Sequence, residues 1–152
     1  MSEGIPEDLP DEVVEEVLSK LPEPEIKIEN VVSSITIDQR LDLQLIARKL
    51  IDVEYQPDQF PGLIYRLDEP KTATLIFSSG KMVCTGAKSK EEALIAVKKI
   101  IEQLNEIGMN IRSEPQIKIQ NIVASASIHL NIHLKITLFK FERATYEPEL
   151  HP

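Results

Sequence analysis

The spacing of hydrophobic residues predicts a long strand followed by a short helix near the start of the chain. Residues 26–37 read IKIENVVSSITI and contain neither Gly nor Pro, a composition typical of a strand. Asp42 can cap a helix over residues 43–51. The apolar positions on one face of that helix are Leu43, Ile46, Ala47 and Leu50.

Three short apolar runs predict further strands, after a loop marked by Pro57, Pro61 and Gly62. They cover residues 63–67, 72–77 and 81–85, and Pro70 and the Ser78-Ser79-Gly80 sequence separate them as turns. Met82 and Cys84 face one side of the last run, whereas Val83 and Thr85 face the other. Because two helices cover one side of such a sheet only, the other side is predicted to be an open apolar binding surface with scattered Asn, Thr and Ser.

The longest predicted helix begins at a capping-box signature and ends at a glycine. Ser89 is followed by Glu92 three residues later, and Gly108 stops the helical pattern. The stripe of this helix consists of Leu94, Val97, Ile101 and Leu104. Cys84 is the only cysteine, so an internal disulfide is excluded, and we expect it to be a small buried residue.

Charge is concentrated in the first 25 residues. The chain has 25 acidic and 17 basic side chains, a net charge of -8, and residues 1–25 hold nine of the acidic ones and one basic one. Subtraction leaves 16 of each sign for residues 26–152, which are neutral overall. The acidic total therefore does not argue against nucleic-acid binding by the domain itself. Within this leader, an apolar stripe between Pro10 and Pro22 predicts a short helix: Val13, Val14, Val17, Leu18 and Leu21.

No apolar run approaches the roughly 18 residues of a membrane span, and the acidic N-terminus is unlike a signal peptide. We therefore expect a soluble intracellular protein. An enzyme is not expected, because the chain contains no Gly-rich phosphate loop, nucleophile elbow or Cys-His pairing. His129 and His133 are four residues apart, but they align with Asp38 and Asp42 in the repeat described next, at a turn and a helix cap, which disfavours a metal site.

The chain repeats itself at an offset of 91 residues. Residues 117–128 read IKIQNIVASASI, and further along YEPELHP stands opposite YQPDQFP. The second copy stops at Pro152, so everything after Pro61 in the first copy has no counterpart. We expect a half repeat to leave strand edges unpaired and apolar surface uncovered, which favours self-association or local disorder.

Several of these motifs resemble the TATA-box-binding protein family, in a wording closer to its archaeal type. They are FPGLIYRL at 60–67, LIFSSGKMVCTGAKS at 75–89, N-(V/I)-V at 30–32 and 121–123, and YEPEL at 146–150. The resemblance implies an α+β saddle of two β-α-β-β-β-β-α repeats, with a curved antiparallel sheet and helices on its convex face. It divides the chain into a leader (1–25), a complete first repeat (26–112) and a partial second repeat (113–152).

The family resemblance also implies a general transcription factor that binds the TATA element in the DNA minor groove and uses no cofactor. Asn30 and Asn121 would hydrogen-bond base edges, with Thr85 assisting. The side chains expected against the groove floor are Val32, Val123, Leu75 and Val83. Phe60 and Phe77 match the aromatic wedges of one half-site, and the expected phosphate contacts are Arg66, Lys81 and Lys88.

The implied protein partners are transcription factor B and the RNA polymerase machinery. Glu147, Glu149 and Leu150 lie in the motif that contacts transcription factor B in this family. The resemblance places the protein at the nucleoid in the cytoplasm if it is archaeal and in the nucleus if it is eukaryotic. The alternative is a fragment or paralogue without DNA binding that acts through partners such as transcription factor B.

The second repeat departs from the family pattern. His151 stands where the first repeat has Phe60, and the partner wedge is absent. We therefore expect weakened binding of TATA DNA, with bending at one end only. A further hypothesis is that the acidic leader helix covers the concave face as a mimic of DNA; docking elsewhere and disorder are its alternatives.

Overall fold

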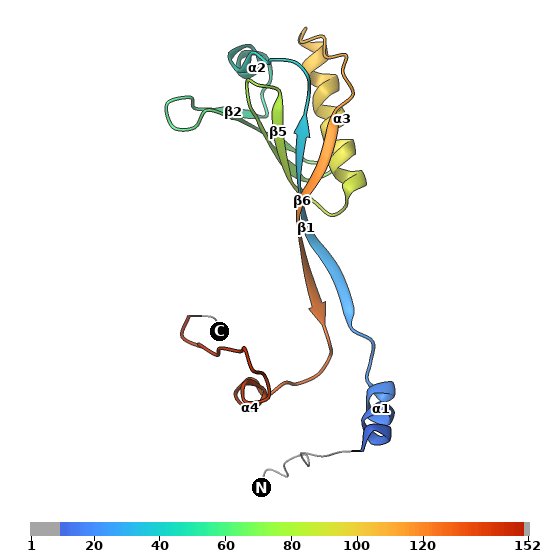
Figure 1. Cartoon of the computed structure of the whole chain (residues 1–152). Coiled ribbons are helices and arrows are strands. Elements are labelled where there is room, and N and C mark those ends of the chain that lie inside the picture. Colours follow the sequence, from blue (N-terminus) through green and yellow to red (C-terminus); the bar gives the residue numbers. More distant parts are fainter. Residues whose placement is uncertain (1–9, 151–152) are drawn as a thin grey trace. The chain divides into compact units, whose positions relative to one another are not determined.

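The computed structural model describes residues 10–150 and shows an antiparallel sheet with helices packed on it (Figure 1). The strands are β1 (Glu25–Thr36), β2 (Val53–Tyr55), β3 (Leu63–Leu67), β4 (Thr72–Ile76), β5 (Lys81–Ala87) and β6 (Gln116–Ser127). The helices are α1 (Asp11–Lys20), α2 (Leu43–Lys49), α3 (Lys90–Glu106) and α4 (Leu134–Leu138). The chain forms two compact units, one of residues 26–125 and one that joins residues 1–25 to residues 126–152.

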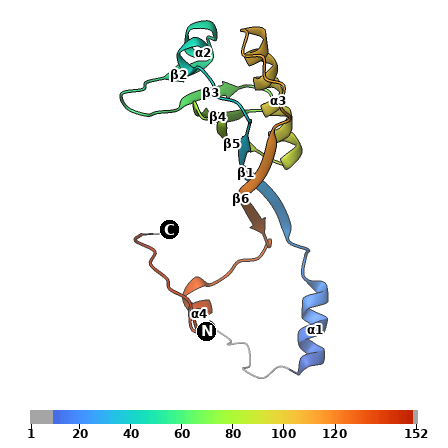
Figure 2. The same ribbon diagram turned by 45° about the horizontal axis from the view of Figure 1, so that its top comes forward.

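The larger unit is built on a curved six-stranded sheet in the order β2-β3-β4-β5-β1-β6 (Figure 2). Side chains alternate between its two faces as the strand period requires. In β4, Thr72, Thr74 and Ile76 are buried beneath the helices, whereas Ala73 and Leu75 are half-buried on the other face. The expected α+β fold, with an antiparallel sheet and helices on one face, is confirmed.

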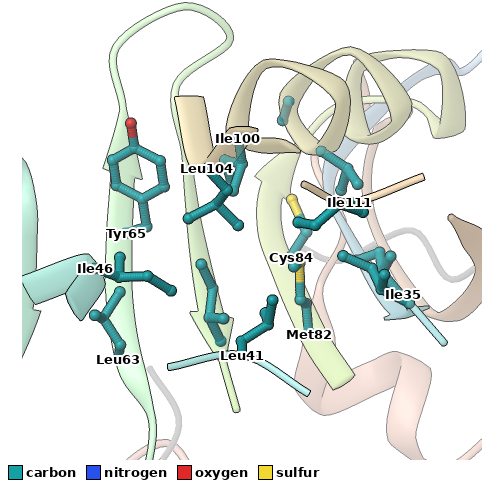
Figure 3. Close-up of a cluster of buried hydrophobic side chains, with 14 of the residues drawn as sticks. Ile35, Leu41, Ile46, Leu63, Tyr65, Met82, Cys84, Ile100, Leu104 and Ile111 are labelled. Carbon is teal, nitrogen blue, oxygen red and sulfur yellow. The ribbon is translucent and has the colours of Figure 1, made fainter. Parts of the chain in front are cut away.

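The hydrophobic core lies between the sheet and helices α2 and α3 (Figure 3). Ile46 of α2 and Ile100 of α3 are fully buried there, as is Cys84 of β5. Burial raises the pKa of the Cys84 thiol, an effect that the Thr74 and Thr72 side chains partly offset. The predicted role of Cys84 as a small buried residue is confirmed.

Local capping signals place the helices nearly as predicted. The Asp42 side chain accepts a hydrogen bond from the Leu45 N–H at 3.0 Å and starts α2. This helix ends at Lys49 rather than residue 51, because Leu50 adopts an extended backbone that leads into β2. The three-residue edge strand β2 was not predicted from the pattern, since VEY is too short to show a period.

Helix α3 has the predicted ends but a shifted buried stripe. Ser89 accepts a hydrogen bond from the Glu92 N–H at 3.1 Å, and Gly108, at φ +98°, ends the helix. The buried side chains are Ala93, Ala96, Val97, Ile100 and Leu104, whereas Leu94 and Ile101 are half-buried. The predicted stripe was therefore partly wrong: Val97 and Leu104 are buried as predicted, but the prediction left out Ala93, Ala96 and Ile100.

The second copy of the repeat forms its first strand, but its apolar side chains are exposed. Strand β6 lies within one residue of the predicted 117–128 segment, and α4 begins at Leu134, the counterpart of Leu43. Ile122 is 51% exposed, although its counterpart Val31 is 1% exposed, and Leu134 and Leu43 differ likewise at 56% and 4%. The expectation of uncovered apolar surface is confirmed.

The predicted leader helix is present as α1, between Pro10 and Pro22. Helix α1 belongs to the smaller unit, and the concave face of the sheet belongs to the larger one. The hypothesis that the leader covers the concave face therefore stays a prediction. The proposed repeat boundaries at 25 and 112 also stay a prediction, because compact units and sequence repeats are different divisions of the chain.

Gly80 provides a stability prediction. It has a φ of +83°, and an added Cβ would lie 2.2 Å from the Gln39 carbonyl oxygen. We expect Gly80→Ala to lower the free energy of unfolding by about 3 kcal/mol or more, measured by chemical denaturation. Gly108→Ala is the control, because its φ is equally positive but nothing lies within 4 Å; it should cost only about 1 kcal/mol. Equal losses in the two variants would contradict this account.

Candidate nucleic-acid interface

The face of the sheet opposite the helices, here called the open face, carries a row of side chains across five strands. Strand register places Glu54 beside Ile64, Ile64 beside Leu75, Leu75 beside Val83 and Val83 beside Ser34. Ile64, Leu75 and Val83 are half-buried, although α2 and α3 lie on the other face of the sheet. The predicted apolar surface with scattered polar groups is therefore present.

Asn30 is held in one orientation by the backbone of β5. Its Oδ1 accepts a hydrogen bond from the Gly86 N–H at 2.7 Å, and its Nδ2 donates to the Thr85 Oγ1 at 3.1 Å. Because the Gly86 N–H can only donate, the amide oxygen must point toward it. One N–H of Nδ2 then remains for a ligand on the open face. Asn30 and Thr85, which were both expected to contact DNA, are thus hydrogen-bonded neighbours in the structure.

The position of Gly86 depends on a bulge in β5. Val31 of β1 pairs with Ala87, but Ser33, two residues on, pairs with Cys84, three residues back. Thr85 and Gly86 therefore share the stretch opposite Val32, and the φ of Gly86 is +97°. This irregularity turns the Gly86 N–H toward Asn30 instead of into the regular ladder.

The two predicted wedge residues lie together. The rings of Phe60 and Phe77 are 5.8 Å apart between centroids and meet edge to face at 65°. Phe60 is 36% exposed, and it precedes β3, whereas Phe77 follows β4. The β3–β4 pairing joins Leu63 to Ile76, which explains why these two chain segments meet.

Two of the three predicted phosphate ligands are paired with carboxylates. The Arg66 Nη1 lies 3.1 Å from the Glu54 Oε2. The Lys88 Nζ lies 3.8 Å from the Glu29 Oε2, and it donates a hydrogen bond to the Glu29 carbonyl oxygen. Lys81 is exposed at the opposite end of β5, where it pairs with Thr36. The open face is therefore not simply cationic.

A cleft of about 770 Å³ lies at the Asn30 end of the open face. Its walls include Asn30, Thr85, Arg66 and Lys88, four of the predicted DNA contacts. The structure thus brings these side chains to one place, although they come from strands β1, β3 and β5 and the residue after β5.

Asn121 and Val123 lie on β6, which pairs with β1. Gln120 donates a hydrogen bond to the Ser34 Oγ at 2.6 Å, and Ser125 donates to the Glu29 Oε1 at 2.8 Å. In the repeat, Gln120 is the counterpart of Glu29, and Ser125 is the counterpart of Ser34. The two contacts are therefore equivalent, which indicates that a local two-fold axis relates β1 and β6.

The predicted partner residues belong to the smaller unit. Glu147, Glu149 and Leu150 are exposed, and Leu150 donates its N–H to the Glu147 carbonyl oxygen. His151 lies outside the described residues. His133 is the N-cap of α4, and His129 precedes it in a loop, so the two histidines do not share a helix face.

Three residues of this surface were not predicted from the sequence. Gly86 orients Asn30, Glu54 pairs with Arg66, and Glu29 lies beside Lys88. A glycine inside a strand pattern often marks a bulge and is a signal for Gly86. The two carboxylates gave no signal, because their roles depend on which strands become neighbours.

Comparison with known proteins identifies the family. Residues 25–107 match the sequence profile described as "Transcription factor TFIID (or TATA-binding protein, TBP)". The chain belongs to the TATA-binding protein family. This result confirms the resemblance deduced from the motifs, and, since the description is that of a transcription factor, it agrees with the prediction that the chain is not an enzyme.

Similar TATA-box-binding proteins come from archaea. The protein from Sulfurisphaera tokodaii is 54% identical over 127 residues, which are 84% of this chain and 64% of that protein. The protein from Methanocaldococcus jannaschii is 52% identical over 88% of this chain and 73% of its own length. The solved structure "Methanococcus jannaschii TBP" matches with a TM-score of 0.77 and 52% identity, over 84% of this chain and 73% of that one. The chain thus spans less than two thirds of the first of these relatives.

None of the helices between residues 10 and 150 is both long enough and apolar enough to cross a membrane. Over the same residues, no three His, Cys, Asp or Glu side chains gather in a way that suits a metal ion.

The contact between β1 and β6 provides a prediction for Glu29. The hydrogen bond from Ser125 is the largest cause that lowers the pKa of this carboxyl, followed by the charges of Lys27 and Lys88. We expect Ser125→Ala to raise the Glu29 pKa, measured by NMR titration of the side-chain carboxyl carbon.

The sign of the linked stability effect follows from the lowered pKa. Ionised Glu29 favours the folded state at neutral pH, and that contribution is lost as the pH falls through the folded-state pKa. Ser125→Ala should reduce this pH dependence. Ser127→Ala is the control, since the Ser127 hydroxyl lies near His129 instead. A Glu29 pKa that Ser125→Ala leaves in place would disprove the assigned cause.

Proposed function

We propose that the chain is a transcription factor that binds TATA-containing duplex DNA through the minor groove, with the open face as the contact surface. The observation that carries this proposal is the orientation of Asn30. Its amide oxygen is occupied by the Gly86 N–H, so the group offered to a ligand is a donor. A·T base pairs present only acceptors in the minor groove, so donor and groove match.

The apolar row around Asn30 supports the same proposal. Leu75 and Val83 are adjacent and half-buried on the face opposite α2 and α3. Such side chains suit the floor of a minor groove, because contact there depends on close packing and not on charge. Phe60 and Phe77 lie at the end of this surface as an aromatic pair that can enter a base step. Asn121, Val32 and Val123 extend the surface along β1 and β6.

Phosphate contacts would come from Arg66, Lys81 and Lys88. Thr85 would assist Asn30 in the hydrogen bonds to base edges. Because His151 stands where the first repeat has the wedge Phe60, we expect DNA bending mainly at the end of the site that the first repeat contacts. The archaeal relatives favour a location at the nucleoid. Recruitment of transcription factor B and RNA polymerase would follow DNA binding and lead to assembly of the initiation complex.

Asn30→Asp tests the observation on which the proposal rests. The substitution keeps the shape of the side chain but replaces its donors by a charged acceptor. We expect affinity for a TATA duplex to fall at least about tenfold, measured by fluorescence anisotropy. Asn110→Asp makes the same charge change at an exposed loop position and should leave affinity within about twofold. Similar losses in both variants would refute the role of Asn30.

The aromatic pair provides a second test, of the wedge function. Phe60→Ala and Phe77→Ala should each reduce affinity about tenfold or more and abolish bending, measured by energy transfer between the ends of a labelled TATA duplex. Phe139→Ala is the matched control, because Phe139 is 86% exposed in the smaller unit. Retained bending in the Phe60 and Phe77 variants would rule out wedge insertion.

A second candidate function is capture of a protein partner without DNA binding. The exposure of Glu147, Glu149 and Leu150 favours it, since transcription factor B would contact these residues. The Phe60 and Phe77 variants distinguish the two candidates. If transcription factor B binds both variants normally and the unsubstituted chain does not distinguish TATA from scrambled duplex, the partner-binding function stands and the DNA-binding function falls.

A further inference from the structure

A carboxylate lies on the same face as the proposed DNA contacts. Glu54 belongs to the edge strand β2, where it pairs with Ile64 of β3. Ile64 and Arg66 are two residues apart on β3 and therefore point to the same face. Glu54 and Arg66 are thus diagonal cross-strand neighbours on the open face, with 3.1 Å between the Oε2 and the Nη1.

This ion pair contributes little to the stability of the fold. The side chains of Glu54 and Arg66 are 49% and 60% exposed, and exposed pairs of this kind are weak. Strand β2 is already held to β3 by three paired residues and by the packing of Val53 and Tyr55 on the core. The consequence of the pair therefore concerns what Arg66 is free to bind.

DNA and Glu54 compete for the same guanidinium group. An arginine binds carboxylate and phosphate through the same planar set of N–H donors. A phosphate that approaches Arg66 must displace Glu54 from it, and the released carboxylate then remains near the negatively charged backbone. Arg66, the one cation of β3, is therefore held back by its neighbour Glu54 on β2.

We propose that Glu54 limits the affinity of the open face for duplex DNA by competing with phosphate for Arg66. This inference rests on the proposed DNA-binding function and adds a residue that tunes its strength and salt dependence. Glu54 acts through Arg66 and contacts no base. An Arg66 bound to Glu54 releases fewer counterions from DNA than a free one, so the pair lowers the salt dependence of binding as well as the affinity.

The experiment measures the dissociation constant of the full chain for a TATA duplex by fluorescence anisotropy. The KCl concentration is varied from about 50 to about 300 mM, so that the dependence of affinity on salt can be determined. Glu54→Gln is expected to tighten binding about two- to five-fold at the lowest salt. It should also steepen the plot of log affinity against log salt by about one unit. A scrambled duplex should show the same steepening, because phosphate contacts carry no sequence information.

Two further variants test whether the effect passes through Arg66. Glu102→Gln removes the same charge from the exposed surface of α3 and should change affinity less than about twofold. Arg66→Gln should weaken binding, and the double variant Glu54→Gln with Arg66→Gln should lose the gain seen for Glu54→Gln alone. Circular dichroism of each variant checks that the fold is retained.

The outcomes separate this inference from the function on which it rests. If the unsubstituted chain prefers TATA over scrambled duplex but Glu54→Gln changes neither affinity nor salt slope, the inference fails and the DNA-binding function stands. An equal gain in Glu102→Gln, or a gain that persists in the double variant, also overturns the role of the pair. If the unsubstituted chain binds no duplex at any salt concentration, the function and the inference fail together.

Discussion

The larger unit depends on one strand, β1, whose side chains reach both faces of the sheet and whose backbone pairs with a neighbouring strand on each side. β1 pairs with β5 on one side and with β6 on the other. Its side chains alternate, so that Val31 and Ile35 enter the core while Asn30 and Val32 face outward. A shift of one residue in its register would exchange these two sets and lose core and surface together. The pairing of β1 is therefore the constraint that every other feature must satisfy.

The bulge in β5 shows how the chemistry of the open face follows from that constraint. The extra residue near Gly86 frees one backbone N–H, which fixes the amide of Asn30 on the neighbouring strand. A ligand then meets a donor that is already oriented, so little rotational freedom is lost on binding. The charged groups are arranged differently: Arg66 and Lys88 each lie beside a carboxylate. Shape and hydrogen bonding are thus fixed in advance, while the charges can exchange partners.

Features with local signals could be predicted from the sequence, and features that depend on register could not. The caps at Asp42 and Ser89 act within a few residues, so the helix starts were correct. The alternation of residues 82–85 in β5 correctly predicted which side chains lie on each face of the strand. β2 was missed because it forms through pairing with β3 rather than through its own pattern, and the buried stripe of α3 was misplaced because it includes the small residues Ala93 and Ala96. For the site, motif resemblance selected the outward residues, but no pattern within one strand reveals that Glu54 lies diagonal to Arg66.

The two copies of the repeat show that burial is a property of the neighbours of a strand and not of its sequence. Val31 and Ile122 occupy equivalent positions in similar segments that share seven of twelve residues, yet one is 1% and the other 51% exposed. The buried hydrophobic residues of the described structure all lie between Val31 and Ile111, so the first repeat supplies the buried core, and Ile117 of β6 packs against it. Covering a side chain such as Ile122 would contribute about 1.5–3 kcal/mol. The second segment therefore retains a pattern suited to a core that the described chain does not supply, and its apolar residues are exposed for that reason.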